Sequence, residues 1–356
     1  MIKKRYVIST LASVLFCGHL LAAQSQQIAL VPGADIVGTV AITALERAPL
    51  LEYINKAGRR KTPSRTIVAR WTRINTATGL TKKDITSALF SCDIDTYDFK
   101  APTLRGRCVR LNGIIAVQLA KPISIGKIQQ AIKLEYGTEE LAGVANITIA
   151  GHPALIVKSQ NKKQPDIYIA VSPNQYALLI ALTPASIAQS IQRAKSGQLI
   201  KEPKPLRDIR ESLPRDSQIK IAAIVPPPIR GLVDQQTTTI QQQALQNPGL
   251  AATAAIIKIF RNLQNISIGI QITNDAILTI AGDLGDSQSA QQASVLISTL
   301  VIPMMQASMQ NQSGSSAPVI NIEKQVKIKS KDTNLIIQIR VPKEQFFAKK
   351  TQRPTR

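Results

Sequence analysis

The clearest pattern in the chain is a strict alternation between residues 266 and 273, where four isoleucines are each followed by a small or polar residue. Such alternation places the isoleucines on one face of a pleated strand. Asn274 and Asp275 then predict a turn, and the apolar run Ala276–Ala281 predicts the returning strand of a β-hairpin. Between Ala293 and Met304 the apolar residues recur at the three/four spacing of a helix, for which the region of Ser287 can provide the cap. We expect this helix to cover the apolar face of the hairpin.

The same order, a hairpin followed by a helix, recurs along the rest of the chain. The earlier part predicts a first strand at 35–42, a hairpin of strands 85–94 and 108–119, and a helix at 124–136. A pair of short strands comes next, followed by a second hairpin of strands 167–171 and 177–182 and a helix at 184–196. The later part repeats this order. It predicts a strand at 219–225, helices at 226–246 and 250–263, a hairpin at 266–281, a helix at 287–304 and a last hairpin at 326–341. The order predicts an α+β fold with antiparallel sheets, helices packed on one face, and two similar halves.

The predicted domain boundaries follow from shifts in composition. Residues 201–214 contain three prolines and alternating charges, which favour a linker because proline interrupts both helical and strand periodicity. The resulting division is a signal peptide at 1–25, a first α+β half at 28–200, the linker at 201–214, a second α+β half at 215–350 and a basic tail at 351–356.

The start of the chain has the features of an export signal. Three basic residues, Lys3, Lys4 and Arg5, precede the apolar run Tyr6–Leu21, and small residues follow near position 22. This run is short for a membrane span, which favours a cleaved signal over an uncleaved anchor. We therefore expect an exported protein of the periplasm or cell surface, with no membrane span in the mature chain.

The chain is strongly basic, with 44 Lys and Arg residues against 22 Asp and Glu, and export would direct this charge toward anionic envelope material. One segment concentrates it, because residues 56–73 contain no acidic side chain. Its basic residues are the anion-binding candidates: Lys56, Arg59, Arg60, Lys61, Arg65, Arg70 and Arg73. A solvated charged surface is the alternative interpretation. Export and an aromatic content of 4% argue against nucleic acid, which single-strand binders hold by stacking on aromatic rings.

Two cysteines, Cys92 and Cys108, remain after removal of the signal. An oxidising compartment favours a disulfide between them, provided that their two predicted strands pair and bring them together. Two separately buried thiols are the alternative.

Catalytic chemistry has few candidates. His152 is the only histidine outside the signal, which leaves no histidine-based triad or multi-histidine zinc site within one chain. Two S-x-x-K matches, Ser124 to Lys127 and Ser217 to Lys220, raise the alternative of a Ser/Lys hydrolase, but a helix cap and a strand position explain them as well. We assign no catalytic, metal or cofactor residues.

Three segments carry a resemblance to a group of exported bacterial proteins of unknown function. They read LVPGADIVGTVAITALERAPLLEYI at 30–54, GLTKKDITSALFSCDI at 79–94 and YALLIALTPASIAQSIQRAKSG at 176–197. The resemblance covers most of the mature chain, implies tandem ferredoxin-like halves, and carries no assigned site. The basic segment 56–73 is not part of the shared pattern. We expect a non-catalytic cell-envelope protein that interacts with an envelope protein or serves as a scaffold, with binding of an anionic polymer or lipid headgroups as the alternative.

Overall fold

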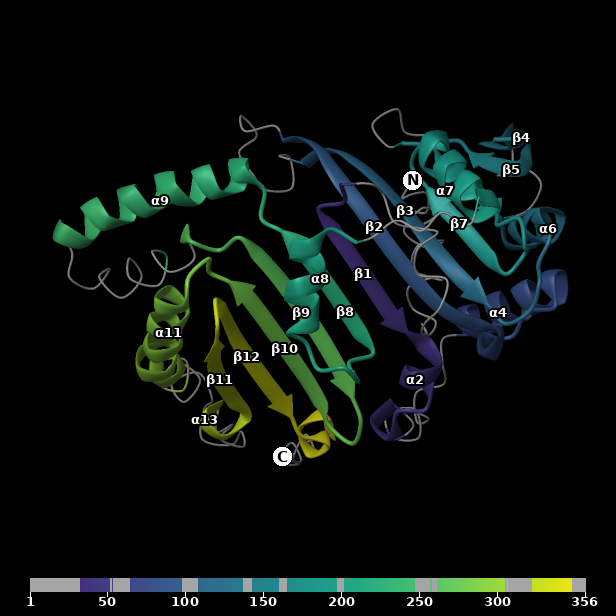
Figure 1. Cartoon of the computed structure of the whole chain (residues 1–356). Helices are drawn as coiled ribbons and strands as arrows, with labels where there is room; N and C mark the ends of the chain where they lie inside the picture. The colour runs from purple at the N-terminus through teal and green to yellow at the C-terminus, as the bar shows by residue number, and fades with distance from the viewer. Residues whose placement is uncertain are drawn as a thin grey trace, which may run out of the picture. The chain divides into compact units, whose positions relative to one another are not determined.

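The computed structural model describes residues 33–51, 53, 65–97, 108–136, 143–159, 165–196, 202–246, 257, 261–304, 306 and 322–347. The expected signal peptide and basic tail lie outside these ranges. The chain divides into two compact units, unit 1 up to Lys204 and unit 2 from Pro205 (Figure 1). Both mix helices with antiparallel strands, which confirms this part of the predicted fold class.

Unit 1 contains seven described strands in the order β1-β2-β3-β7-β6-β5-β4, and each neighbouring pair is antiparallel. The strands are β1 (Ile36–Ala41), β2 (Ile85–Tyr97), β3 (Cys108–Leu119), β4 (Val144–Ile149), β5 (His152–Val157), β6 (Ile167–Val171) and β7 (Ala177–Ala181). Its helices are α2 (Ile42–Glu46), α4 (Arg65–Thr78), the 3₁₀ turn η2 (Lys82–Asp84), α6 (Ile125–Tyr136) and α7 (Pro184–Ser196). The sheet is therefore built from hairpins, as the alternation predicts.

Unit 2 contains five described strands in the order β8-β9-β10-β12-β11, again with antiparallel neighbours. The strands are β8 (Ile219–Ile224), β9 (Asn265–Ile272), β10 (Ala276–Asp283), β11 (Val326–Lys331) and β12 (Asn334–Val341). The helices are α8 (Lys204–Glu211), α9 (Pro227–Gln246), α11 (Ser287–Leu296), the π-helical turn η5 (Ile297–Val301), α13 (Ile322–Gln325) and the 3₁₀ turn η6 (Lys343–Phe347). The alternation at 266–273 thus gives the expected hairpin, β9–β10.

The two units have the same connectivity when each is considered by itself. Unit 1 has the additional pair β4–β5; without it, each unit has five strands. The first strand (β1 or β8) pairs with the second (β2 or β9) across a helical connection, and the second forms a hairpin with the third (β3 or β10). The fifth strand (β7 or β12) lies between the third and the fourth (β6 or β11). A ferredoxin-like fold is a split βαβ, in which the strands on either side of the first helix are separated by another strand. Here these strands, β1 with β2 and β8 with β9, pair directly and antiparallel. The ferredoxin-like arrangement is therefore not confirmed.

Helices cover both faces of the sheet in unit 1, so the prediction of helices on one face is wrong. Val117 of β3 belongs to the same buried core cluster as Ile132 of α6. Asn112 of the same strand accepts a hydrogen bond of 2.7 Å from the Ser186 hydroxyl of α7. Residues 112 and 117 lie on opposite faces of the strand because successive side chains alternate. The physical reason is that β6 and β7 are apolar at nearly every position, as strands buried on both faces are.

The same correction applies to unit 2. Leu335 of β12, on the face of the β9 isoleucines, shares a core cluster with Ala290 of α11. The opposite face packs against α8, where the Ser267 hydroxyl donates to the carbonyl of Ile209 over 2.9 Å. Ser267 is only 1% exposed, whereas the alternating isoleucines of β9 are half-buried. Small residues on the face that we expected to be solvated allow this close approach of the helix.

The predicted linker at 201–214 contains helix α8, and this prediction is also corrected. Leu206 is fully buried and Ile209 is 2% exposed, so the helix is packed on the sheet of unit 2. The three prolines do not prevent the helix, because Pro203 and Pro205 lie at its beginning and Pro214 lies beyond its end. The first turn tolerates proline, since its N–H groups have no intrahelical acceptor.

One position in β1 depends on the absence of a side chain. Gly38 lies opposite Phe90 of β2, and a Cβ atom placed on Gly38 would be 2.1 Å from the Phe90 ring. The ring therefore occupies the space above the glycine, an arrangement in which an aromatic residue compensates for glycine in a sheet.

A carboxylate fixes the β9–β10 turn to the end of β12. Asp275 accepts hydrogen bonds from Arg340 Nε over 2.7 Å and from the Lys343 amide over 3.1 Å. Partial burial raises the pKa of Asp275, but the bonds from Arg340 and Lys343 outweigh it and hold the pKa below its usual value. The carboxyl group is therefore charged in the folded state at neutral pH.

Candidate anion-binding cleft

The predicted basic segment is only partly described. Four of its candidates lie outside the described residues: Lys56, Arg59, Arg60 and Lys61. The other three lie along α4: Arg65, Arg70 and Arg73. The proposed role of this segment in anion binding remains a prediction.

The strand register places the two cysteines far apart. Cys92 lies opposite Gly113, whereas Cys108 lies opposite Tyr97. Five residues of β3 separate Cys108 from the position opposite Cys92, which corresponds to about 17 Å along the strand. A disulfide requires Cα atoms roughly 4.4–6.8 Å apart. The predicted Cys92–Cys108 disulfide does not fit this register, because the strands are shifted relative to the pairing that it requires.

The S-x-x-K matches have structural explanations. The Ser124 hydroxyl accepts a bond of 3.4 Å from the Lys127 amide at the start of α6, as a helix cap does. In the second match the Lys220 ammonium group donates to the carbonyl of Arg215 over 2.9 Å, and the Ser217 hydroxyl has no hydrogen-bond partner within the described part of the chain. His152 begins β5 directly after a tight turn formed by Ala150 and Gly151, both with positive φ.

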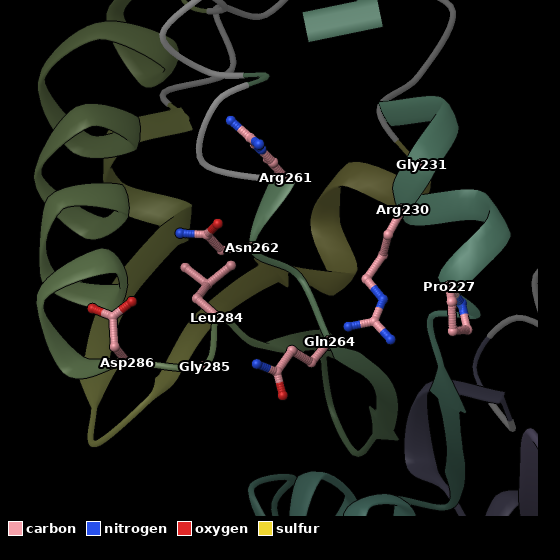
Figure 2. Close-up of a pocket in the computed structure, with 9 residues that line it drawn as sticks. All are labelled: Pro227, Arg230, Gly231, Arg261, Asn262, Gln264, Leu284, Gly285 and Asp286. Carbon is pink, nitrogen blue, oxygen red and sulfur yellow. The ribbon is translucent and has the colours of Figure 1, made fainter. Parts of the chain in front are cut away.

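Unit 2 contains a cleft of about 670 Å³ at the end of its sheet, close to the start of α9 (Figure 2). Its volume lies within the range of small-ligand sites, roughly 300–1,000 Å³. Three segments far apart in sequence form it: the first turns of α9, the residues before β9, and the connection from β10 to α11. The lining residues are Pro227, Arg230, Gly231, Arg261, Asn262, Gln264, Leu284, Gly285 and Asp286.

Backbone hydrogen bonds fix the floor of this cleft. The Gln264 carbonyl accepts from the Val225 amide at the end of β8, and the Gln264 amide donates to the Asp283 carbonyl at the end of β10, both over 2.8 Å. The Gln264 side chain lies against Gly285, where an added Cβ would be 2.4 Å from its amide nitrogen. Gly285 also has φ +79°, which favours glycine. The floor therefore combines three strand ends in one fixed arrangement.

The acidic member of the lining is engaged at the start of α11. Asp286 is the N-cap and accepts from the Ser289 amide and hydroxyl, over 2.6 and 2.7 Å. The hydrogen bond from the Ser289 amide lowers the pKa of Asp286 below its ordinary value. Asn262 completes this side by donating to the Ser289 hydroxyl over 3.1 Å. The Asp286 charge is thus balanced by the helix it caps, a favourable position for a carboxylate.

Arg230 differs from Asp286 because part of its charged group lacks a partner. Its Nε atom is buried, yet it makes no hydrogen bond to any described residue. Figure 2 shows the side chain leaving α9 and extending toward Gln264, whereas Arg261 points away on the other side. An unsatisfied buried donor costs about 1–3 kcal/mol, more for a charged group, so such groups call for an explanation.

The cleft can therefore bind an anion. A small rotation of the Arg230 side chain would present its Nε–Nη edge, which matches two oxygens of a carboxylate or phosphate in a bidentate pair. Arg261, an exposed residue of the same lining, adds positive charge. The amide of Gln264 can donate to a further oxygen. These groups could hold an anionic ligand, and they include no residue that we assign to catalysis.

Sequence reasoning did not identify this cleft. Its residues occur in three short segments with 29 and 19 residues between them, and no spacing motif connects them. The only local signals are the three prolines that precede Arg230 and the DLGD sequence at 283–286, which predict a helix start and a turn.

The described residues show neither a membrane-spanning helix nor a metal cluster. Among them, no helix is both long and apolar enough to cross a membrane. No group of three or more His, Cys, Asp or Glu residues in the same ranges is placed to hold a metal ion. No protein-family model, curated protein or solved structure matches the chain.

Proposed function

We propose that this chain is an exported, non-catalytic protein of the cell envelope that binds an anionic group in the cleft of unit 2. The observation that carries the proposal is the buried Nε of Arg230, which has no hydrogen-bond partner in the described part of the chain and lies in a cleft of ligand size. A carboxylate or phosphate oxygen supplies the acceptor that the described residues do not provide. The predicted export signal and the basic composition support the proposal of an anionic partner in the envelope.

The proposal predicts a measurable affinity for simple anions. Binding of inorganic phosphate and of acetate is measured by titration calorimetry with the wild-type protein and with Arg230→Met. A hydrogen bond to a charged group contributes about 1.5–3 kcal/mol, so the substitution should weaken binding about 10- to 150-fold. The preferred anion shows whether the group recognised is a phosphate or a carboxylate.

The matched control is Arg207→Met, which makes the same chemical change at a half-exposed position on α8. Arg207 is 3.6 Å from Asp208 in a surface ion pair, which contributes little to stability. Equal loss of affinity in the two variants would show that total charge, and not the cleft, governs binding. Absence of binding by the wild-type protein to either anion would refute the proposal.

A further inference from the structure

The strand β11, in the last hairpin of unit 2, has one face toward the core and one basic face. On β11, Val326 and Ile328 pack against the core cluster that contains α11. The alternate positions are lysines: Lys327, Lys329 and Lys331. All three are exposed, and none makes an ion pair or hydrogen bond with another described residue. Three lysines without a partner in the described ranges therefore form a single row.

The row has a regular geometry. Alternate residues of an antiparallel strand are about 7 Å apart, so three lysines span about 14 Å. The register places Gln338 and Asn334 of β12 beside the two outer lysines, and both carry amide groups. The nearest acidic residue in the sequence, Asp332, lies in the turn that follows the strand.

We propose that the basic face of β11 binds a linear polyanion along the strand. A chain with one phosphate, sulfate or carboxylate group about every 7 Å would place successive charges opposite successive lysines. A membrane surface fits less well, because it would favour cations spread over an area with exposed apolar anchors, whereas the apolar residue on the lysine face of this hairpin, Ile336 beside Lys329, is half-buried. This surface is separate from the Arg230 cleft, and the proposal does not depend on it.

Edge protection is the competing explanation. β11 is the last strand of its sheet, and lysines on an edge strand hinder pairing with other chains. The two explanations differ in what the charge must be. Protection needs any charge, so glutamate should serve as well as lysine, whereas polyanion binding needs a positive charge.

The experiment compares three variants by binding to a fluorescent heparin fragment over a series of salt concentrations. The first is K327E/K329E/K331E, and the second replaces the same lysines by glutamine. The control, K127E/K133E/K158E, makes the same charge change at exposed lysines of unit 1. Loss of three contacts should lower the slope of log affinity against log salt by about 2, on the basis of about 0.7 for each contact.

The expected result is that the glutamate variant stays monomeric and loses heparin binding, while the control retains it. Equal losses in the glutamate variant and the control would overturn the proposal in favour of a global charge effect. Self-association of the glutamine variant with unchanged heparin affinity would overturn it in favour of edge protection. Stronger dependence on these lysines for binding to phosphatidylglycerol vesicles than for heparin would replace the polymer by a membrane. Arg230→Met should leave the heparin slope unchanged, which separates this test from that of the cleft.

Discussion

Replacement of Arg230 by methionine should have opposite effects on ligand binding and on stability. Methionine keeps most of the apolar length of the side chain and removes the guanidinium group. The wild-type protein without ligand carries a buried Nε that has no described partner. The variant removes that desolvated donor, and the flexible methionine side chain can pack in the space of the arginine stem.

The magnitude follows from the cost of an unsatisfied buried donor, about 1–3 kcal/mol. Arg230 is only half-buried as a residue, so we expect the lower part of that range. The free energy of unfolding of the ligand-free protein should therefore be unchanged or higher by about 1 kcal/mol in the variant. At a saturating anion concentration the wild type should instead be more stable than the variant, since a ligand at 100 times its dissociation constant stabilises the wild type by about 2.7 kcal/mol.

Urea unfolding with and without the preferred anion measures both effects in one experiment. Arg207→Met is again the control and should show neither the gain without anion nor the loss of anion-dependent stabilisation. A decrease of more than 1 kcal/mol in the ligand-free stability of the Arg230 variant would refute the reasoning, because it would show that the guanidinium already has a stabilising partner.

Four further predictions test the fold. Gly38→Ala should lower the free energy of unfolding by about 1–3 kcal/mol, because the new Cβ overlaps the Phe90 ring, and a double-mutant cycle with Phe90→Ala should remove most of this cost. Leu206→Ala should cost about 2–5 kcal/mol in chemical denaturation if α8 is packed as described, whereas a linker residue would cost almost nothing. Arg340→Gln should lower the free energy of unfolding at pH 7 by about 0.5–1 kcal/mol, because Arg340 helps to hold the pKa of Asp275 below its unfolded value. The difference between the variant and the wild type should begin to shrink near pH 4, the unfolded pKa of Asp, and shrink further as the pH falls through the lowered pKa of Asp275; a difference that stays constant from pH 7 to pH 2 would contradict the pairing. Mass spectrometry of the unreduced protein should show no bridge between the two cysteines of the mature chain, and a linked peptide would contradict the register of β2 and β3.

The sequence predicted the strands well because hairpins are local. The alternation at 266–273 and the turn at Asn274–Asp275 are contained within a few residues, and the structure confirms the hairpin there. Helix α8 was missed because proline is read as a breaker unless its position in the first turn is known. The prediction of helices on one face left the side of the sheet that carries Ser267 uncovered, since composition alone does not show which small residues lie under a helix.

The cleft could not be predicted for a different reason. Arg230, Gln264 and Asp286 come together only when the end of β8, the start of β9 and the end of β10 meet at the same edge of the sheet. The register between β2 and β3 was likewise not determined by the sequence pattern, so the two cysteines could be placed side by side, whereas the structure pairs Cys92 with Gly113. Long-range register, which is not encoded in a local pattern, decided both outcomes.

The shared connectivity of the two units has a consequence for protein engineering. β6 and β11 hold the same place in their units, but β6 is enclosed between β5 and β7, whereas β11 has a neighbour on one side only. Their sequences differ accordingly, IYIAV against VKIKSK. A chimera that carried the β6 sequence in place of β11 would keep the topology but would have an uncharged, apolar edge strand that is prone to pair with other chains. Equivalent segments of the two units therefore cannot be exchanged freely.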